Sequence, residues 1–160
     1  MSASWVRRAR AEDIESIVAI DAIVNPTPWP RSRFVTLMDR AADAPASLLV
    51  CEDVGRVCGY LVYNTVLDES TIENIGIRQD CQRRGMARKL VSVALDQMLL
   101  VGIRRCLLEV RVSNTPARGL YDHLGFVHDG VRKNYYRSES GPEDACLMSL
   151  DLQGEHDERA

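Results

Sequence analysis

The sequence predicts a mixed α/β domain, and three observations carry this prediction. Two apolar runs, 46–53 and 56–66, are separated only by a Val-Gly turn, which is typical of a β-hairpin. Residues 85–101 carry apolar side chains at helical spacing, and the glycine that follows them fits a helix stop. The chain of 160 residues has the length of one domain with a sizeable core.

The first part of the fold is expected to begin with a short strand over 5–9 and a helix that follows Asp13. Apolar residues at helical spacing continue this helix to Val24. The segment NPTPWP at 25–30 ends it, because proline blocks the continuation of a helix. A second short helix is expected over 31–40.

After the hairpin, the sequence predicts four further strands, in chain order 68–77, 104–110, 126–136 and 143–152. The long helix lies between the first and second of these strands, and a last helix between the second and third. Ser113 or Asn114 can cap that last helix, with Pro116 in its first turn. Gly125 ends it, and a polar loop at 137–142 joins the last two strands.

Composition argues against several classes of protein. An apolar content of 46% and a charged content of 27% are ordinary for a soluble globular protein. The net charge of −3 argues against a general nucleic-acid binder. The N-terminal residues lack the apolar segment of a signal peptide, and no run approaches the ~20 apolar residues of a membrane span. A cytoplasmic protein that binds neither nucleic acid nor membrane is expected.

The five cysteines do not form a recognisable framework. Their number is odd and no C-x-x-C spacing occurs, which argues against disulfides and against a zinc site, so no metal is expected. Cys81 lies in a basic loop where no histidine motif supports a nucleophile, and it is expected to be a bystander. The other four lie in apolar runs and are expected in the core: Cys51, Cys58, Cys106 and Cys146.

A basic loop lies between the strand predicted at 68–77 and the long helix. Residues 78–89 hold four arginines and one lysine against the single acid Asp80. A helix N-terminus favours an anion, most naturally phosphate, because its N–H groups are unpaired and its dipole end is positive. The Walker pattern is absent, and Gly85 alone does not supply G-x-G-x-x-G. What remains is Q-x-x-G-x-A at Gln82, Gly85 and Ala87, whose small residues let the backbone approach a pyrophosphate.

This pattern resembles the acyl-CoA-binding signature of the GNAT N-acetyltransferase superfamily. The loop follows a strand ending IGI and precedes a long amphipathic helix, and Asn114, Tyr121 and a Gly-Phe pair come later in order. The resemblance implies a single-domain GNAT fold: a mixed, mostly antiparallel sheet of about six to seven strands flanked by about four helices. We expect this domain to cover residues 1–152 and to be followed by a flexible tail at 153–160.

By the same resemblance, the protein uses acetyl-CoA as its cosubstrate. The backbone of Ile75, Gly76 and Ile77 would hold the pantetheine, and Gly76 replaces the more usual alanine, which should still allow close approach. Asn114 would hydrogen-bond the pantetheine arm or simply cap its helix, and the two roles are compatible. The pyrophosphate would be seated by Gln82, Arg83, Arg84, Gly85, Met86, Ala87 and Arg88.

Longer segments are similar to the RimI branch of this superfamily: VLDESTIENIGI, LLEVRVSN, GLYDHLGF and VRKNYYRSESGPEDACLMSL. Enzymes of that branch acetylate the N-terminal alanine of a small-subunit ribosomal protein. The Pro28-Trp29 pair also matches the branch. The resemblance therefore implies an N-terminal protein acetyltransferase in which the amine attacks directly in a ternary complex, with a ribosomal protein as partner.

Two residues are expected to carry the chemistry. By resemblance, Glu109 is the general base that deprotonates the amine, directly or through a water; otherwise it is a charged residue at an exposed strand end. By resemblance, Tyr121 is the general acid toward the leaving sulfur, since a phenol with a pKa near 10 is protonated at neutral pH. Its alternative role is that of a core aromatic residue on an amphipathic helix.

The acceptor is expected beside the strand predicted at 68–77 and beside the last two strands. Glu69, Glu73 and Asn74 lie on the strand at 68–77, where a carboxylate would favour a cationic N-terminus, although acids on strands are more often merely solvated. Tyr135 and Tyr136 precede the polar loop, which by resemblance closes over the acceptor.

Three alternatives stay open. The first is a GNAT enzyme of broader N-terminal, lysine or small-amine specificity, because acceptor selectivity lies in loops. The second is a non-catalytic acyl-CoA-binding regulatory module, which the joint presence of Glu109 and Tyr121 disfavours. The third is a toxin that acetylates charged transfer RNA, and the net charge of −3 disfavours it.

Overall fold

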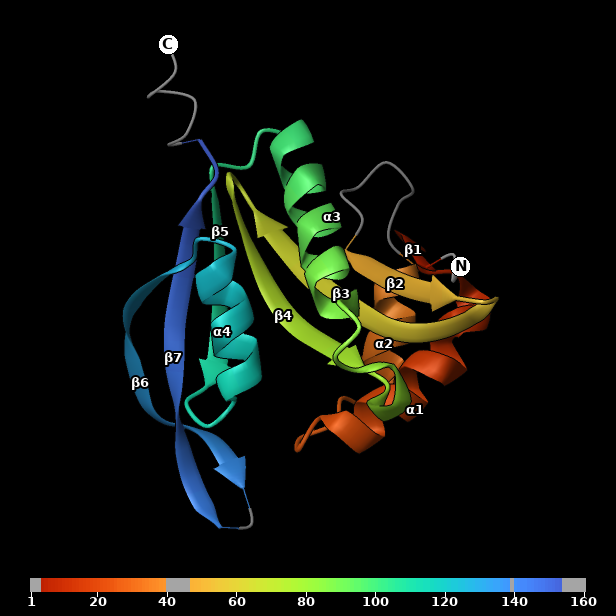
Figure 1. Cartoon of the computed structure of the whole chain (residues 1–160), viewed down its shortest axis with the longest axis horizontal. Coiled ribbons are helices and arrows are strands. Elements are labelled where there is room, and N and C mark those ends of the chain that lie inside the picture. The colour runs from red at the N-terminus through yellow and green to blue at the C-terminus, as the bar shows by residue number, and fades with distance from the viewer. Residues whose placement is uncertain (1–3, 40–46, 139, 154–160) are drawn as a thin grey trace. The chain divides into compact units, whose positions relative to one another are not determined.

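A computed structural model describes residues 4–39, 47–138 and 140–153 (Figure 1). The described part holds seven strands and four α-helices, which confirms the predicted mixed α/β fold. Most of the predicted tail, residues 154–160, and the end of the predicted second helix at residue 40 lie outside the described residues. The strands are β1 (Ser4–Arg8), β2 (Leu48–Asp53), β3 (Arg56–Val66), β4 (Glu69–Ile77), β5 (Arg105–Arg111), β6 (Val127–Ser138) and β7 (Gly141–Asp151). The helices are α1 (Ile14–Val24), α2 (Arg31–Met38), α3 (Met86–Leu100) and α4 (Thr115–His123), with short 3-10 turns at Ala11–Asp13 and Gln79–Cys81.

The strands form one sheet in the order β1-β2-β3-β4-β5-β7-β6. The pairs β1–β2, β2–β3, β5–β7 and β7–β6 are antiparallel, whereas β4 and β5 are parallel. By their contacts the residues form two compact units. The first unit comprises Met1–Tyr63 and Asn74–Gln97, and the second comprises Asn64–Glu73 and Met98–Ala160.

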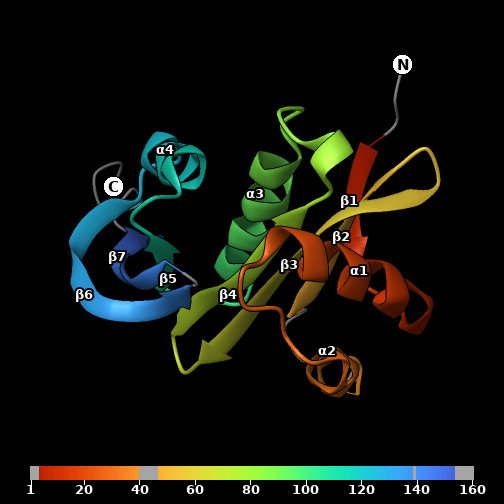
Figure 2. The same cartoon turned by 90° about the horizontal axis from the view of Figure 1, so that it is seen from below.

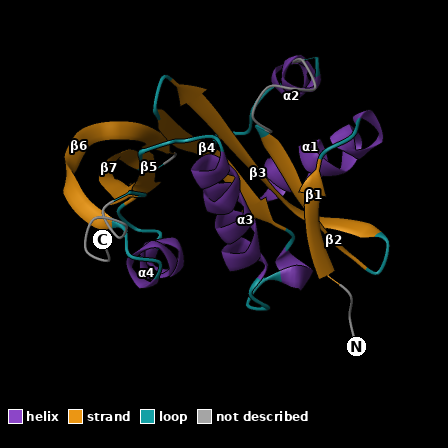
Figure 3. Cartoon of the chain, turned by 90° about the horizontal axis from the view of Figure 1, so that it is seen from above, coloured by secondary structure: helices purple, strands orange, loops and turns teal. Residues whose placement is uncertain are grey.

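In the first unit, helices cover both faces of β2 and β3 (Figures 2 and 3). α1 and α2 lie on one face, where Ile17, Phe34 and Val50 belong to one buried apolar cluster. α3 lies on the other face, and a Cβ built at Gly59 would come within 3.4 Å of Leu90 on α3. The apolar sides of these helices therefore face the sheet, as their sequence spacing predicted.

In the second unit, α4 lies beside β5 and β7, and β6 curves around β7 (Figures 1 and 2). Asn114 is the N-cap of α4, and its Oδ1 accepts a hydrogen bond from the Ala117 N–H at 3.3 Å. Tyr121 on α4 packs against Phe126, with ring centroids 5.4 Å apart. The predicted cap and the predicted inner face of this helix are both confirmed.

The structure corrects the prediction of a polar loop at 137–142. Arg137 and Ser138 instead end β6, Gly141 and Pro142 begin β7, and Ser138 pairs with Gly141. Gly141 has a φ of 113°, a backbone conformation that glycine adopts without steric cost. Pro142 is tolerated because it lies beyond Ala145, the last β7 residue that pairs with β5, so that only β6 flanks it.

Candidate active site

The basic loop between β4 and α3 contains two residues in the left-handed region. Arg83 has a φ of 64° and Gly85 a φ of 79°, and α3 begins at Met86. A Cβ built at Gly85 would meet no atom within 4 Å, so the positive φ rather than a lack of space favours glycine. At the start of α3, the Lys89 N–H donates to the Gly85 carbonyl. The N–H groups before Lys89 in the first turn are therefore available to an anion.

Neighbouring strands hold two side chains of this loop. Gln82 donates to the carbonyl of the last residue of β4 at 3.0 Å, and Arg84 pairs with the buried Asp53 of β2 at 3.3 Å. Within the described residues, Arg83 and Arg88 pair with no acid. The groups that remain for a phosphate are therefore these two guanidinium groups and the backbone N–H groups of the helix start.

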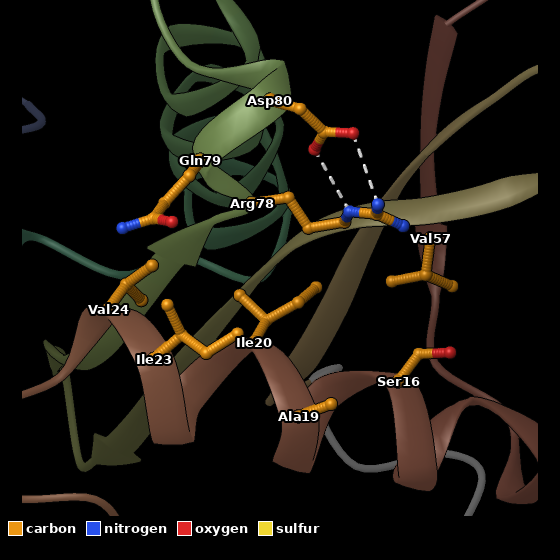
Figure 4. A pocket seen from close by; sticks show the side chains of 9 residues that line it. All are labelled: Ser16, Ala19, Ile20, Ile23, Val24, Val57, Arg78, Gln79 and Asp80. Carbon is orange, nitrogen blue, oxygen red and sulfur yellow. Dashed lines mark hydrogen bonds and ion pairs between the residues drawn. The ribbon is translucent and has the colours of Figure 1, made fainter.

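Two surface hollows lie in the first unit. One, of about 550 Å³, lies between β1 and the first turns of α3, and Gly85 and Arg88 are part of its lining. The other, of about 440 Å³, runs along α1 (Figure 4). Its wall is apolar at Ile23 and other α1 side chains, and its rim carries the ion pair of Arg78 with Asp80. None of the predicted site residues lines this second hollow.

Asn74, which the sequence placed near the acceptor, is buried in a polar network centred on Asp21. The Asp21 carboxylate accepts hydrogen bonds from the Tyr60 hydroxyl at 2.7 Å and the Asn74 amide at 3.1 Å. It also accepts from the Asn25 amide at 2.9 Å and the Trp29 N–H at 2.7 Å. Burial and then the bond to Asp21 raise the pKa of Tyr60, which keeps its phenol protonated. The network links the NPTPWP segment to β3 and β4. The Asn74 amide is therefore already hydrogen-bonded within the protein.

The end of β4 carries the three residues predicted to face pantetheine. Contact with Tyr60 explains why the middle residue, Gly76, is a glycine. A Cβ built at Gly76 would lie 2.7 Å from Cε1 and 2.9 Å from the hydroxyl oxygen of Tyr60. Ile75 and Ile77, on either side, are half-buried. Glycine at position 76 is therefore matched to the Tyr60 ring, a reason that the sequence alone did not reveal.

Glu109 lies on β5, one residue beyond the last recorded β4–β5 pair, and its side chain is partly buried. Its Oε1 is 3.2 Å from the Arg132 guanidinium of β6. The Tyr135 hydroxyl also hydrogen-bonds the Glu109 carboxylate, and this bond is the main reason why the pKa of Tyr135 is raised. Glu109 is therefore held by two β6 side chains and is not simply an exposed residue at a strand end.

Tyr136 lies among charged neighbours in the same unit. Burial and then the charge of Glu109 raise the pKa of Tyr136 to about 12. The Arg111 guanidinium lies over the Tyr136 ring, 4.2 Å from its centroid, and pairs with Glu143 at 3.6 Å. The structure thus brings Glu109, Tyr135 and Tyr136 together, as expected for a shared site.

Tyr121 is 3% exposed, and burial raises its pKa. A phenol with a raised pKa stays protonated at neutral pH, as a general acid must be. Burial against Phe126 also fits the plain core role, so the two interpretations of Tyr121 coexist in this structure. Asn114 acts as a helix cap, which leaves its amide N–H groups outside the capping bond.

The two predicted acceptor carboxylates on β4 lie in different surroundings. Glu69 is 3.8 Å from Arg105, which also reaches Asp129 at 3.6 Å. Arg105 precedes Glu109 by four residues on β5, or about 13 Å along a strand, so Glu69 lies away from the proposed base. Glu73 is exposed and directly follows Ile72, the residue that pairs with Leu108 next to Glu109.

All five cysteines are free and buried, including Cys81. Burial and then contact with Cys58 raise the pKa of Cys81 to about 12, which keeps the thiol protonated and unreactive. In the described ranges, no group of three or more His, Cys, Asp or Glu residues could hold a metal ion. No helix in those ranges is both long and apolar enough to cross a membrane.

Residues 14–126 match the model of the acetyltransferase (GNAT) family. The chain belongs to the GNAT acetyltransferase family. A [ribosomal protein bS18]-alanine N-acetyltransferase from Haemophilus influenzae is 33% identical to this GNAT protein over 150 residues, which cover 93% of this chain and 99% of that enzyme. The enzyme of the same name from Escherichia coli is 39% identical over 98 residues, which cover 61% of this chain and 66% of that enzyme.

The crystal structure of the ribosomal-protein-S18-alanine N-acetyltransferase from Escherichia coli matches this GNAT chain with a TM-score of 0.85. The two are 29% identical, and the match covers 94% of each chain. These similarities confirm the predicted family, the RimI resemblance and the single GNAT fold, and they make the protein an N-acetyltransferase. The GNAT family uses acetyl-CoA.

Three contacts around the predicted site residues of this GNAT protein were missed by sequence reasoning: the Arg132–Glu109 pair, the Arg84–Asp53 pair and the Asp21 network. Each of them joins residues that are far apart in the chain. The only sequence signal for the Asp21 network was an acid on the inner face of an otherwise apolar helix.

Proposed function

We propose that this protein is a RimI-type enzyme that transfers the acetyl group of acetyl-CoA to the α-amino group of the N-terminal alanine of ribosomal protein bS18. The observation that carries the proposal is the similarity to enzymes of that name, which for Haemophilus influenzae spans 99% of the enzyme. In this proposal residues 1–152 form the acetyltransferase domain. The reaction takes place in the cytoplasm on a protein N-terminus, without contact to nucleic acid or membrane and without a metal.

The cofactor residues of the proposal fit an acyl-CoA. Backbone N–H groups at the start of α3, with Arg83 and Arg88, hold the pyrophosphate, while Gln82 and Arg84 keep the loop in place. Gly85, Met86 and Ala87 let the chain approach the phosphates closely. The backbone of Ile75, Gly76 and Ile77 and the amide of Asn114 bind the pantetheine arm.

When bound, acetyl-CoA supplies the thioester whose acetyl group is transferred. Glu109 accepts a proton from the α-ammonium of the acceptor, directly or through one water, because an ammonium has no lone pair with which to attack. Tyr121 donates its phenolic proton toward the departing sulfur, and its burial keeps that proton in place until then. Tyr135 and Tyr136 border the acceptor beside Glu109.

Carboxylates near Glu109 attract the cationic N-terminus. Glu73 is the better placed of the two predicted acids, because it follows Ile72, the residue that pairs with Leu108 next to Glu109. Asn74 contributes by fixing the β4 backbone through Asp21.

The test is thiol release from acetyl-CoA with a short peptide that begins with alanine. The same peptide with a blocked N-terminus and a peptide with only a lysine amine are the controls. Release with the free alanine alone supports the proposal. Release with lysine, or with many unrelated N-termini at equal rates, favours a broader GNAT specificity, and acetyl-CoA binding without any transfer favours a regulatory module.

A further inference from the structure

β6 has an irregular segment opposite β7. The register between the two strands shifts between Arg132 and Tyr136, so the intervening residues bulge out of the ladder. Asn134 in this bulge has a φ of 56°, and its N–H donates to Asp144 Oδ1 at 2.9 Å. A bulge that is fixed in this way redirects the side chains around it.

The bulge directs Arg132 and Tyr135 onto one carboxylate. The Arg132 guanidinium is 3.2 Å from Glu109 Oε1 and 4.8 Å from the centroid of the Tyr135 ring. The Tyr135 hydroxyl bonds the same carboxylate. In this arrangement Glu109 faces a cationic donor, Arg132, which repels an approaching α-ammonium, so the amine reaches the carboxylate more easily once Arg132 has moved away.

Arg132 is the donor that is free to leave. Its side chain is 53% exposed, whereas that of Glu109 is 25% exposed, so the guanidinium can turn into solvent while the carboxylate stays. An ion pair with one half-exposed partner is weak because water screens it. The incoming α-ammonium carries the same single positive charge, so an exchange of Arg132 for the acceptor keeps the charge at Glu109 balanced.

We propose that Arg132 is a positioning residue that aims the Glu109 carboxylate in the resting enzyme and gives way to the cationic N-terminus of the acceptor. This inference rests on the proposed function, because it assigns Glu109 as the base. The other charged or titratable groups around Glu109 are Tyr135 and Tyr136 on β6, Arg111 on β5, Glu143 on β7 and Glu73 on β4. Arg111 is paired with Glu143, so Arg132 is the cation that acts directly on the base.

The test compares Arg132→Gln with Arg132→Lys and with Arg31→Gln. Arg31 pairs with Glu15 at 2.7 Å between α2 and α1, and both side chains are mostly exposed, so it is a matched ion pair without a role in the reaction. The measurement is kcat/KM for the alanine peptide against pH, together with acetyl-CoA affinity. Arg132→Gln is expected to move the acid limb of this profile to higher pH, because the variant lacks the cation that faces the carboxylate.

Arg132→Lys and Arg31→Gln are expected to keep the wild-type limb, and all three variants to keep acetyl-CoA affinity within about twofold. The inference would be overturned if the acid limb of Arg132→Gln coincided with that of the wild type. It would also be overturned if Arg132→Gln lost acetyl-CoA affinity to the same extent as activity. A second readout needs no turnover: the ¹³C titration of the Glu109 carboxyl, assigned with Glu109→Gln. If the wild type acetylates no peptide, the proposed function fails. The titration midpoint of Glu109 still tests the role of Arg132: an upward shift in Arg132→Gln supports that role, and an unchanged midpoint contradicts it.

Discussion

Gly76→Ala tests the match between β4 and Tyr60. The added methyl group would lie 2.7 Å from Cε1 of Tyr60, closer than real Cβ atoms approach a neighbour. The ring has little freedom to move, because it is fully buried and its hydroxyl is bonded to Asp21 and Asn74. Overpacking of a core costs about 1–3 kcal/mol, and a strained hydrogen bond to a carboxylate adds about 1.5–3 kcal/mol. The free energy of unfolding is therefore expected to fall by about 2.5–6 kcal/mol.

The assay is urea unfolding at equilibrium, with Gly119→Ala as the matched control. Gly119 lies in α4, and a Cβ there meets no atom within 4 Å, so the control should be neutral or stabilising by up to about 1 kcal/mol. In a Tyr60→Leu background, where the ring is absent, Gly76→Ala should cost less than about 1 kcal/mol. Equal costs of Gly76→Ala in the two backgrounds would refute the assignment of Tyr60 as the obstacle.

Three further predictions concern the base, the loop and acid stability. Glu109→Gln should lower kcat by roughly 10²–10⁴ with acetyl-CoA affinity nearly intact, whereas an equal loss of affinity would make Glu109 structural. Gly85→Glu should weaken acetyl-CoA binding in calorimetry far more than Gly85→Ala does. Both variants place a side chain at the positive φ of residue 85, but only glutamate adds a negative charge. Equal affinities of the two variants would contradict the assignment of this loop to the phosphates. Burial opposes ionisation of Asp13, but hydrogen bonds from Arg7 and the Arg10 N–H outweigh it and hold the pKa of Asp13 below its ordinary range. This stabilisation is present above about pH 4 and is lost as the pH falls further, so the acid decline of the urea midpoint should flatten in Asp13→Asn.

Local patterns were sufficient to predict the helices that carry the site. The long helix expected over 85–101 is observed at Met86–Leu100, because an apolar stripe and a terminal glycine are both local signals. Asn114 was one of two predicted caps and is the residue that caps α4. The strand residues at the two ends of 137–142 were mistaken for a loop because this segment shows no apolar alternation.

Contacts between distant elements were beyond such patterns. The pairing of Arg132 with Glu109 depends on a bulge in β6 and on the positive φ of Asn134, which no spacing in the sequence reveals. The same holds for Tyr60, which looked like one apolar residue of a strand and is in fact a hydrogen-bond donor inside the core. The sequence therefore predicted the elements that carry the candidate site better than it predicted the contacts that hold its residues.

The two ion pairs at the candidate site differ in how easily a ligand can open them. Asp53 is 4% exposed, and its Oδ1 has no hydrogen-bond partner among the described residues, so removal of Arg84 would leave a buried charge unpaired. Although the Arg84 side chain is 44% exposed, leaving the buried Asp53 carboxylate without its partner typically costs several kcal/mol, more than one contact to a phosphate returns. Glu109 and Arg132 are both partly exposed, and such pairs contribute only about 0.2–1 kcal/mol. Arg84 therefore stays with Asp53 and shapes the loop, whereas Arg132 is available for exchange. A substrate is expected to displace the cation beside Glu109 and not the cation beside the phosphate-binding loop.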